Sequence, residues 1–167
     1  MTAADVIIAA VERERERLIS FYQELVRIPT VWGEAGPLRA AAELIASTLS
    51  PAGYEVELAD SGTDGMPMVI ARLPGDGGGR SLLFNGHMEV YPPSTSWSVD
   101  PFGGVIRDGK LYGQGAADMK GGTAAMTMAC WLLGAGQPAA WVPHPPEVEK
   151  RPAARSAPRR PGRTCRA

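Results

Sequence analysis

The sequence predicts an α/β domain over residues 1–135 and a segment of a different kind over residues 136–167. In the first part, stretches with apolar residues every three to four positions interleave with stretches of period two. This interleaving is typical of an α/β sandwich with a largely buried sheet. The first part holds 10 basic and 16 acidic residues, and the second holds 7 basic and 2 acidic residues. We therefore expect two units with a boundary near residue 135.

Two helices are expected near the N-terminus. From Thr2 to Val26 the apolar residues keep helical spacing, and alternating Glu and Arg residues allow ion pairs three and four positions apart. This pattern predicts one long amphipathic helix that stops before Pro29. After a loop over residues 30–36, Pro37 suits the first turn of a second helix, which ends near Gly53.

Strands are expected in the middle of the chain. Three short segments alternate every second residue or are rich in β-branched and apolar residues: 54–58, 68–73 and 81–84. The glycine-rich stretch 75–79 is expected to be a surface turn, since it lacks the Lys-Ser/Thr pair of a phosphate-binding loop. Asp108-Gly109 is a strong hairpin signal at the centre of residues 105–112. Residues 123–133 return to helical spacing.

Composition excludes several classes of partner. With 17 Lys+Arg against 18 Asp+Glu the formal net charge is −1, so neither nucleic acid nor an anionic membrane surface is an expected partner. No apolar run approaches the roughly 18 residues that span a bilayer, and the first residues lack the basic start of a signal peptide. The two cysteines, Cys130 and Cys165, are too few for a disulfide framework. A reducing, cytoplasmic setting is therefore expected.

The segment 136–167 cannot build a core of its own. It holds seven prolines and six arginines, and no periodic apolar stretch of useful length. We expect it to be disordered or to be the product of a shifted reading frame.

The first candidate functional residues are His87 and Glu89, which follow the apolar run 81–84 directly. Functional side chains collect beyond the carboxyl ends of strands in α/β sheets. Residues two apart in an extended segment point to the same side, so the Glu89 carboxylate can fix the imidazole tautomer while the other ring nitrogen binds a metal. The alternative is a hydrogen-bonded histidine at a strand end beside an exposed glutamate.

The second candidate is Asp118, which lies in a glycine-rich stretch leading into the last helix. One interpretation is an N-cap, the commonest role of an aspartate at such a junction. The other is a carboxylate whose two oxygens bridge two cations, with glycines that allow close backbone approach.

Taken in order, these elements closely resemble the N-terminal catalytic segment of the M20 metallopeptidases over about residues 15–135. The resemblance begins with Leu25-Val-Arg-Ile-Pro-Thr30. Two motifs follow, Gly86-His87-x-Glu89-Val90-x-Pro92 and Trp97-x-x-Asp100-Pro101-Phe102. The last motif covers residues 108–122 and contains Gly113-x-Gly115-x-x-Asp118-Met119-Lys120. The family includes acetylornithine deacetylases, succinyl-diaminopimelate desuccinylases, aminoacylases and glutamate-releasing carboxypeptidases.

The resemblance implies a zinc-peptidase-like catalytic domain, with a central mixed sheet flanked by helices, of which this chain carries only the N-terminal portion. It implies two zinc ions, or sometimes cobalt, and hydrolysis of an amide or peptide bond in an N-acyl amino acid or small peptide. By motif position His87 matches a ligand of one metal and Asp118 the carboxylate that bridges both. Glu89 is expected to be a catalytic residue, because it occupies the position where the family usually has an aspartate that orients the histidine. A homodimer is implied only for an intact chain with a lid domain.

Two departures from the family pattern limit this chain. Glu89 is one methylene longer than the usual aspartate, so altered metal affinity and a lower rate are expected. The Glu-Glu pair that supplies the general base, and the remaining ligands, have no counterpart, because Glu147, Glu149 and His144 lie in proline-rich sequence. We therefore expect a truncated or frameshifted hydrolase that is inactive alone, with open strand edges and poor solubility. The alternative is a non-catalytic remnant or binding module.

Substrate identity is not fixed by the sequence. Tyr91 and Trp97, in the stretch that follows the His87 motif, are expected to line at most one wall of the pocket.

Overall fold

The computed structural model describes residues 2–62, 65–75 and 79–135. The expectations for the 136–167 segment and for the centre of the glycine-rich turn lie outside the described residues. The elements follow in the order α1 (Ala3–Arg13), α2 (Arg15–Arg27), α3 (Ala35–Leu49), η1 (Ser50–Ala52), β1 (Glu55–Asp60), β2 (Pro67–Arg72), β3 (Val105–Arg107), β4 (Lys110–Tyr112), η2 (Ala116–Lys120) and α4 (Gly121–Gly134). Helices and strands interleave as expected, which confirms the α/β class.

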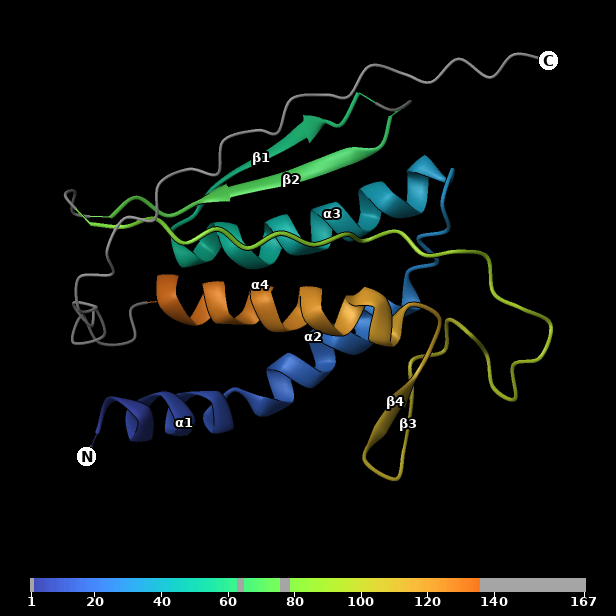
Figure 1. Cartoon of the computed structure of the whole chain (residues 1–167), viewed down its shortest axis with the longest axis horizontal. Coiled ribbons are helices and arrows are strands. Elements are labelled where there is room, and N and C mark those ends of the chain that lie inside the picture. Colours follow the sequence, from blue (N-terminus) through green and yellow to red (C-terminus); the bar gives the residue numbers. More distant parts are fainter. Residues whose placement is uncertain (1, 63–64, 76–78, 136–167) are drawn as a thin grey trace, which may run out of the picture.

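The N-terminal helix is two helices, so the prediction of one continuous helix is wrong. Thr2 and Asp5 form a capping box that starts α1, and the helix stops at Glu14, whose backbone leaves helical geometry with φ −98° and ψ 10°. Residues 12–17 are all charged, so this stretch offers no apolar side chain of its own to the core. The Glu14 carboxylate instead pairs with Arg13 at 3.6 Å and Arg17 at 3.4 Å. Figure 1 shows α1 and α2 meeting at an angle.

The core lies where α2, α3 and α4 pack together. Its buried members are Phe21, Leu25, Ala41, Ile45, Leu49, Ala124 and Met128. Full burial of an aliphatic or methionine side chain contributes about 1.5–3 kcal/mol relative to exposure. In Figure 1 α3 and α4 run side by side, with β1 and β2 along the outer side of α3. The three helices therefore form the frame that carries the loops of the site.

The described β structure consists of two antiparallel hairpins and one parallel bridge. β1 pairs with β2 from Glu55↔Arg72 to Asp60↔Pro67, and β3 pairs with β4 from Val105↔Tyr112 to Arg107↔Lys110. The second hairpin turns at Asp108 and Gly109, whose φ values of 52° and 70° fit the expected two-residue turn. The parallel bridge joins Val31 to Val90.

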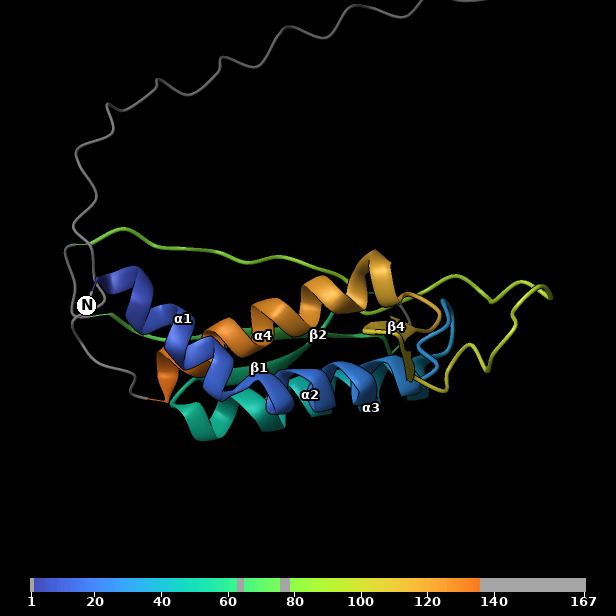
Figure 2. The same ribbon diagram turned by 90° about the horizontal axis from the view of Figure 1, so that it is seen from below.

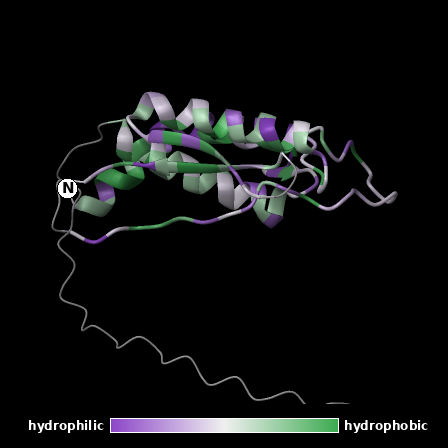
Figure 3. Ribbon diagram, turned by 90° about the horizontal axis from the view of Figure 1, so that it is seen from above, coloured by the Kyte–Doolittle hydropathy of each residue, from purple (hydrophilic) through white to green (hydrophobic). Residues whose placement is uncertain are grey.

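The segment 81–84 is not a strand, which corrects the prediction of a third one. It runs extended past α4 (Figures 1 and 2), but within the described part of the chain no neighbouring strand pairs with it. Leu82 is 75% exposed and Leu83 is 86% exposed. Figure 3 shows this hydrophobic stretch lying apart from the helices. An extended apolar run with exposed side chains and no paired neighbour is a surface that favours contacts with other chains.

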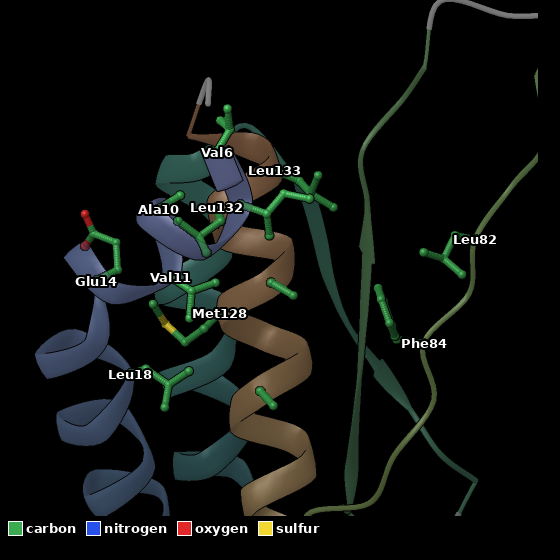
Figure 4. A pocket seen from close by; sticks show the side chains of 13 residues that line it. Val6, Ala10, Val11, Glu14, Leu18, Leu82, Phe84, Met128, Leu132 and Leu133 are labelled. Carbon is green, nitrogen blue, oxygen red and sulfur yellow. The ribbon is translucent and has the colours of Figure 1, made fainter. Parts of the chain in front are cut away.

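A hollow of about 390 Å³ lies between this segment, α1 and α4. Figure 4 shows Leu82 and Phe84 on one side of it and Val6, Val11 and Leu132 on the other. Its lining is almost wholly apolar, with Glu14 as its one acidic member.

In the described ranges, no helix has the length and apolar composition needed to cross a bilayer.

Replacing both Leu82 and Leu83 by lysine should reduce self-association of the full chain. Exposed apolar side chains on an unpaired extended segment favour contacts between copies, and like charges oppose them. Sedimentation velocity over a range of concentrations measures the effect. Ile106→Lys is the matched control, because Ile106 is 46% exposed but lies on the distant β3 hairpin. A wild-type mass that does not change with concentration would contradict the prediction.

Gly134→Ala should destabilise the fold by about 1–3 kcal/mol. Gly134 closes α4, and a Cβ there would overlap the Ala52 carbonyl oxygen and lie 2.8 Å from the Tyr54 ring. Backbone cannot yield as a flexible side chain does, so α4 must shift away from η1. Urea unfolding measures the change. Gly36→Ala is the control: a Cβ at that helical position meets nothing within 4 Å, and its stability should be unchanged or slightly higher.

Candidate active site

Backbone hydrogen bonds fix the segment that carries His87 against the loop after α2. The Val90 amide donates to the Thr30 carbonyl at 2.8 Å, and the Trp32 amide donates to the Val90 carbonyl at 2.9 Å. The Thr30 hydroxyl donates to the Met88 carbonyl at 2.6 Å, and Thr30 is fully buried. These bonds hold the residues on either side of Glu89 in one place.

His87 lies between Glu89 and Asp118, so the structure brings all three expected site residues together. Its Nε2 lies 3.2 Å from Asp118 Oδ1, and its Nδ1 lies 3.1 Å from the Glu89 backbone oxygen. The Glu89 carboxylate is farther from Nδ1, at 3.8 Å. From α4, the Thr123 hydroxyl donates to the His87 carbonyl at 3.1 Å. The imidazole is therefore oriented through both ring nitrogens.

A neutral imidazole carries one N–H and donates to one of these acceptors at a time. Donation from Nδ1 to the Glu89 carbonyl leaves the Nε2 lone pair facing Asp118, which is the arrangement that a metal-binding histidine needs. Glu89 is thus placed to act on His87 mainly through its backbone oxygen, with the carboxylate as a second, longer contact.

Asp118 is not a helix cap. It lies in η2 with non-helical angles of φ −128° and ψ 100°, and the peptide bond to Met119 is cis. The residues that precede η2 and α4 are Gly115 and Lys120, and neither makes a side-chain capping bond. The Asp118 side chain is 90% exposed and faces His87, which rules out the N-cap interpretation.

Lys120 is a buried cation beneath this loop that sequence reasoning missed. Its side chain is fully buried, and Nζ donates to the Ile28 carbonyl at 2.6 Å. Burial lowers the pKa of Lys120 to about 8. Its position two residues after Asp118 was the only available signal, and lysine is rarely buried. The ammonium group ties η2 to the end of α2.

The three residues open into a pocket of about 600 Å³. Its other lining residues come from the loop after α2, from the His87 segment and from the Gly113–Ala117 loop: Trp32, Val90, Tyr91, Gly113, Gln114, Gly115, Ala116 and Ala117. Tyr91 lines the wall as expected, whereas Trp97 does not. Trp32 was not anticipated, because it lies far away in the sequence.

The described residues fit part of a zinc centre. His87 Nε2 and Asp118 Oδ1 are ligand types that zinc accepts, and they converge. Zinc sites in proteins usually take three or four protein ligands, and within residues 2–62, 65–75 and 79–135 no group of three or more His, Cys, Asp or Glu side chains is placed to hold a metal. The expected two-zinc centre is therefore not completed by the described residues.

Comparison with known proteins identifies the family. The sequence model of peptidase family M20/M25/M40 matches residues 83–139, a range that includes His87, Glu89 and Asp118. The succinyl-diaminopimelate desuccinylase of Methylobacterium radiotolerans is 42% identical over 111 residues. Succinyl-diaminopimelate desuccinylase 2 of Ruegeria sp. is 43% identical over 108 residues. Over residues 83–139 the chain therefore matches the M20 peptidase family, and it is similar to these desuccinylases.

Solved structures of dipeptidases resemble this chain in fold. Human carnosine dipeptidase 1 superposes with a TM-score of 0.69 at 25% identity, over 79% of this chain. The dipeptidase Dug1p of Saccharomyces cerevisiae gives a TM-score of 0.70 at 19% identity, over 81% of this chain. In both desuccinylase comparisons the matched region makes up 64% of this chain. It makes up only 27% of the Methylobacterium protein and 26% of the Ruegeria protein. It covers 31% of the human structure and 32% of the yeast structure.

Zinc titration of the full, tag-free chain should depend on His87 and Asp118. Loss of a partner of a ligand already weakens metal affinity about 10- to 100-fold, so His87→Ala and Asp118→Asn should each weaken it at least about tenfold. Glu89→Gln should have a smaller effect, because the nearer contact to Nδ1 is the backbone oxygen. Isothermal titration calorimetry measures all three.

His144→Ala is the control for this titration, since the chain has only two histidines. It should bind zinc as the wild type does. Equal affinity in wild type, His87→Ala and Asp118→Asn would show that His87 and Asp118 are not ligands.

Proposed function

We propose that this chain contributes part of the active site of a metal-dependent hydrolase that cleaves an amide or peptide bond of an N-acyl amino acid or small peptide. The observation that carries the proposal is the convergence of His87 Nε2 and Asp118 Oδ1 at 3.2 Å, with Nδ1 turned to Glu89. The names of the relatives agree with this reaction class, because desuccinylases and dipeptidases both act on amide bonds.

Each residue has a proposed role. His87 would hold one zinc ion through Nε2, the Asp118 carboxylate would be shared between two zinc ions, and Glu89 would position the imidazole; cobalt is an alternative metal. Bound metal would polarise the scissile carbonyl and activate water. The residues of this chain would hold the metal ions and orient the ligands, and the pocket beside them would admit the substrate.

The proposed site is completed by groups other than the described residues. Two converging ligands leave a zinc ion mostly coordinated by solvent. We therefore propose that the chain by itself does not turn over substrate, and that it acts in the cytoplasm, where the free thiol of Cys130 stays reduced. The proposed ligands are small molecules, and a homodimer is proposed only for a chain with a lid domain.

A chimera tests the proposal directly. The matched segment of this chain replaces its counterpart in the Methylobacterium radiotolerans desuccinylase, which supplies the remaining residues of a full-length protein. The chimera should hydrolyse N-succinyl-diaminopimelate, an N-acetyl amino acid or a dipeptide, and His87→Ala or chelation should reduce kcat by at least about 100-fold. The unmodified 167-residue chain with zinc should show no turnover.

Asp60→Asn in the chimera is the control, because Asp60 lies at the end of β1, outside the pocket, and its carboxylate accepts from the Gly62 amide at 2.8 Å. It should leave kcat unchanged. A folded chimera without activity, made from a chain that still binds zinc through His87, would favour the non-catalytic binding module instead.

A further inference from the structure

We propose that Trp32 and Tyr91 form a subsite for an apolar side chain of the ligand, beside the His87–Asp118 pair. This inference rests on the proposed function for the nature of the reaction, and on the pocket alone for binding. Both aromatic side chains line the same pocket as the two expected metal ligands. A group held against them therefore lies next to the place where the bond would be cleaved.

The Trp32 and Tyr91 side chains are exposed to solvent, whereas most aromatic side chains in folded proteins are largely buried. Trp32 is 59% exposed and Tyr91 is 83% exposed. Neither belongs to the core cluster of α2, α3 and α4 or packs against it. Aromatic side chains carry large apolar areas, and their exposure in a concave site marks a surface that a ligand can cover.

The backbone beneath both rings is already fixed. Val31 and Val90 form the parallel bridge, so Trp32 and Tyr91 each follow directly after one of its partners. The Trp32 amide donates to the Val90 carbonyl at 2.9 Å, and Gln114 Nε2 donates to the Tyr91 carbonyl at 2.9 Å. A ligand would therefore bind without first ordering these two backbones, which lowers the entropic cost of binding.

The charges around the pocket decide which ligand group fits. Among the described residues that line it, the ionisable side chains are Tyr91, His87, Glu89 and Asp118, and there is no lysine or arginine. Lys120 is close in sequence, but its ammonium group is buried and donates to the Ile28 carbonyl. In the metal-free chain, a carboxylate in this part of the pocket would find two carboxylates and no cationic side chain.

A cationic side chain is the remaining competitor. It would be attracted to Glu89 and Asp118, but the Asp118 side chain is 90% exposed, and an ion pair with so exposed a carboxylate contributes little because solvent screens it. The rings themselves favour an apolar or aromatic group through area burial and stacking. We therefore assign the subsite to an apolar side chain, with aromatic groups preferred.

Binding to the metal-free full chain tests the subsite without any hydrolysis. The probes are the N-acetyl amides of phenylalanine, alanine, lysine and glutamate, titrated in the presence of chelator. The readout is the indole N–H signal that Trp32→Ala removes from the amide NMR spectrum. The phenylalanine probe should bind about tenfold more tightly than the alanine probe, and the lysine and glutamate probes should bind no better than alanine.

Substitutions separate stacking from a general loss of structure. Trp32→Ala and Tyr91→Ala should each weaken binding of the phenylalanine probe several-fold. Binding to Tyr91→Ala is measured through the Trp32 indole signal. Binding to Trp32→Ala, which lacks that signal, is measured by ligand-observed NMR. Tyr91→Phe should retain the affinity, because the ring and not the hydroxyl is used. Trp97→Ala is the matched control, since Trp97 does not line the pocket.

The outcomes distinguish the subsite from the proposed function. Equal affinity for all four probes, tightest binding of the lysine or glutamate probe, or no binding at all would overturn the subsite. A phenylalanine preference that persists in His87→Ala, together with an inactive chimera, would refute the hydrolase and retain the subsite. An active chimera without a preference for the phenylalanine probe would support the hydrolase and refute the subsite.

Discussion

The parallel bridge between Val31 and Val90 is the constraint on which the site depends. It joins the loop after α2 to the segment that carries His87 and Glu89, and it places the buried Val90 side chain against Gly115. A Cβ at Gly115 would overlap Val90, and the φ of 72° at Gly115 is one that glycine adopts without cost. The close approach brings η2, and with it Asp118, up to His87 across 31 positions of sequence.

Much of the site could be predicted because its signals are local. The turn at Asp108-Gly109 needs two residues with positive φ, and the Asp-Gly dipeptide is one of the pairs that adopt this geometry most readily. His87 and Glu89 share a side through period-two spacing, and the motif that contains Asp118 identifies it as a partner without any knowledge of distance. The structure adds that the nearer contact of His87 is the Glu89 backbone oxygen, which no side-chain pattern can indicate.

The errors share a physical cause: each depends on what a residue packs against. The charge alternation around Glu14 is compatible with a continuous helix, and the break appears only in the Glu14 backbone angles of φ −98° and ψ 10°. Residues 81–84 have the composition of a buried strand, but strand formation also requires a neighbouring backbone. The burial of Lys120 was not predicted, because lysine is rarely buried and its contact with the Ile28 carbonyl spans 92 positions.

The His87–Asp118 hydrogen bond and a metal ion would compete for the same two atoms. The bond forms in the tautomer that carries the proton on Nε2, and a hydrogen bond to a charged acceptor contributes about 1.5–3 kcal/mol. Asp118 is 90% exposed, so its charge stays solvated and the bond is weaker than a buried one would be. Zinc can therefore displace it at little cost, but the same exposure means that two ligands alone gain little from excluding water. Tight zinc binding would therefore require further ligands, whereas the orientation of His87 toward Asp118 and the placement of Trp32 and Tyr91 beside them are set within this chain.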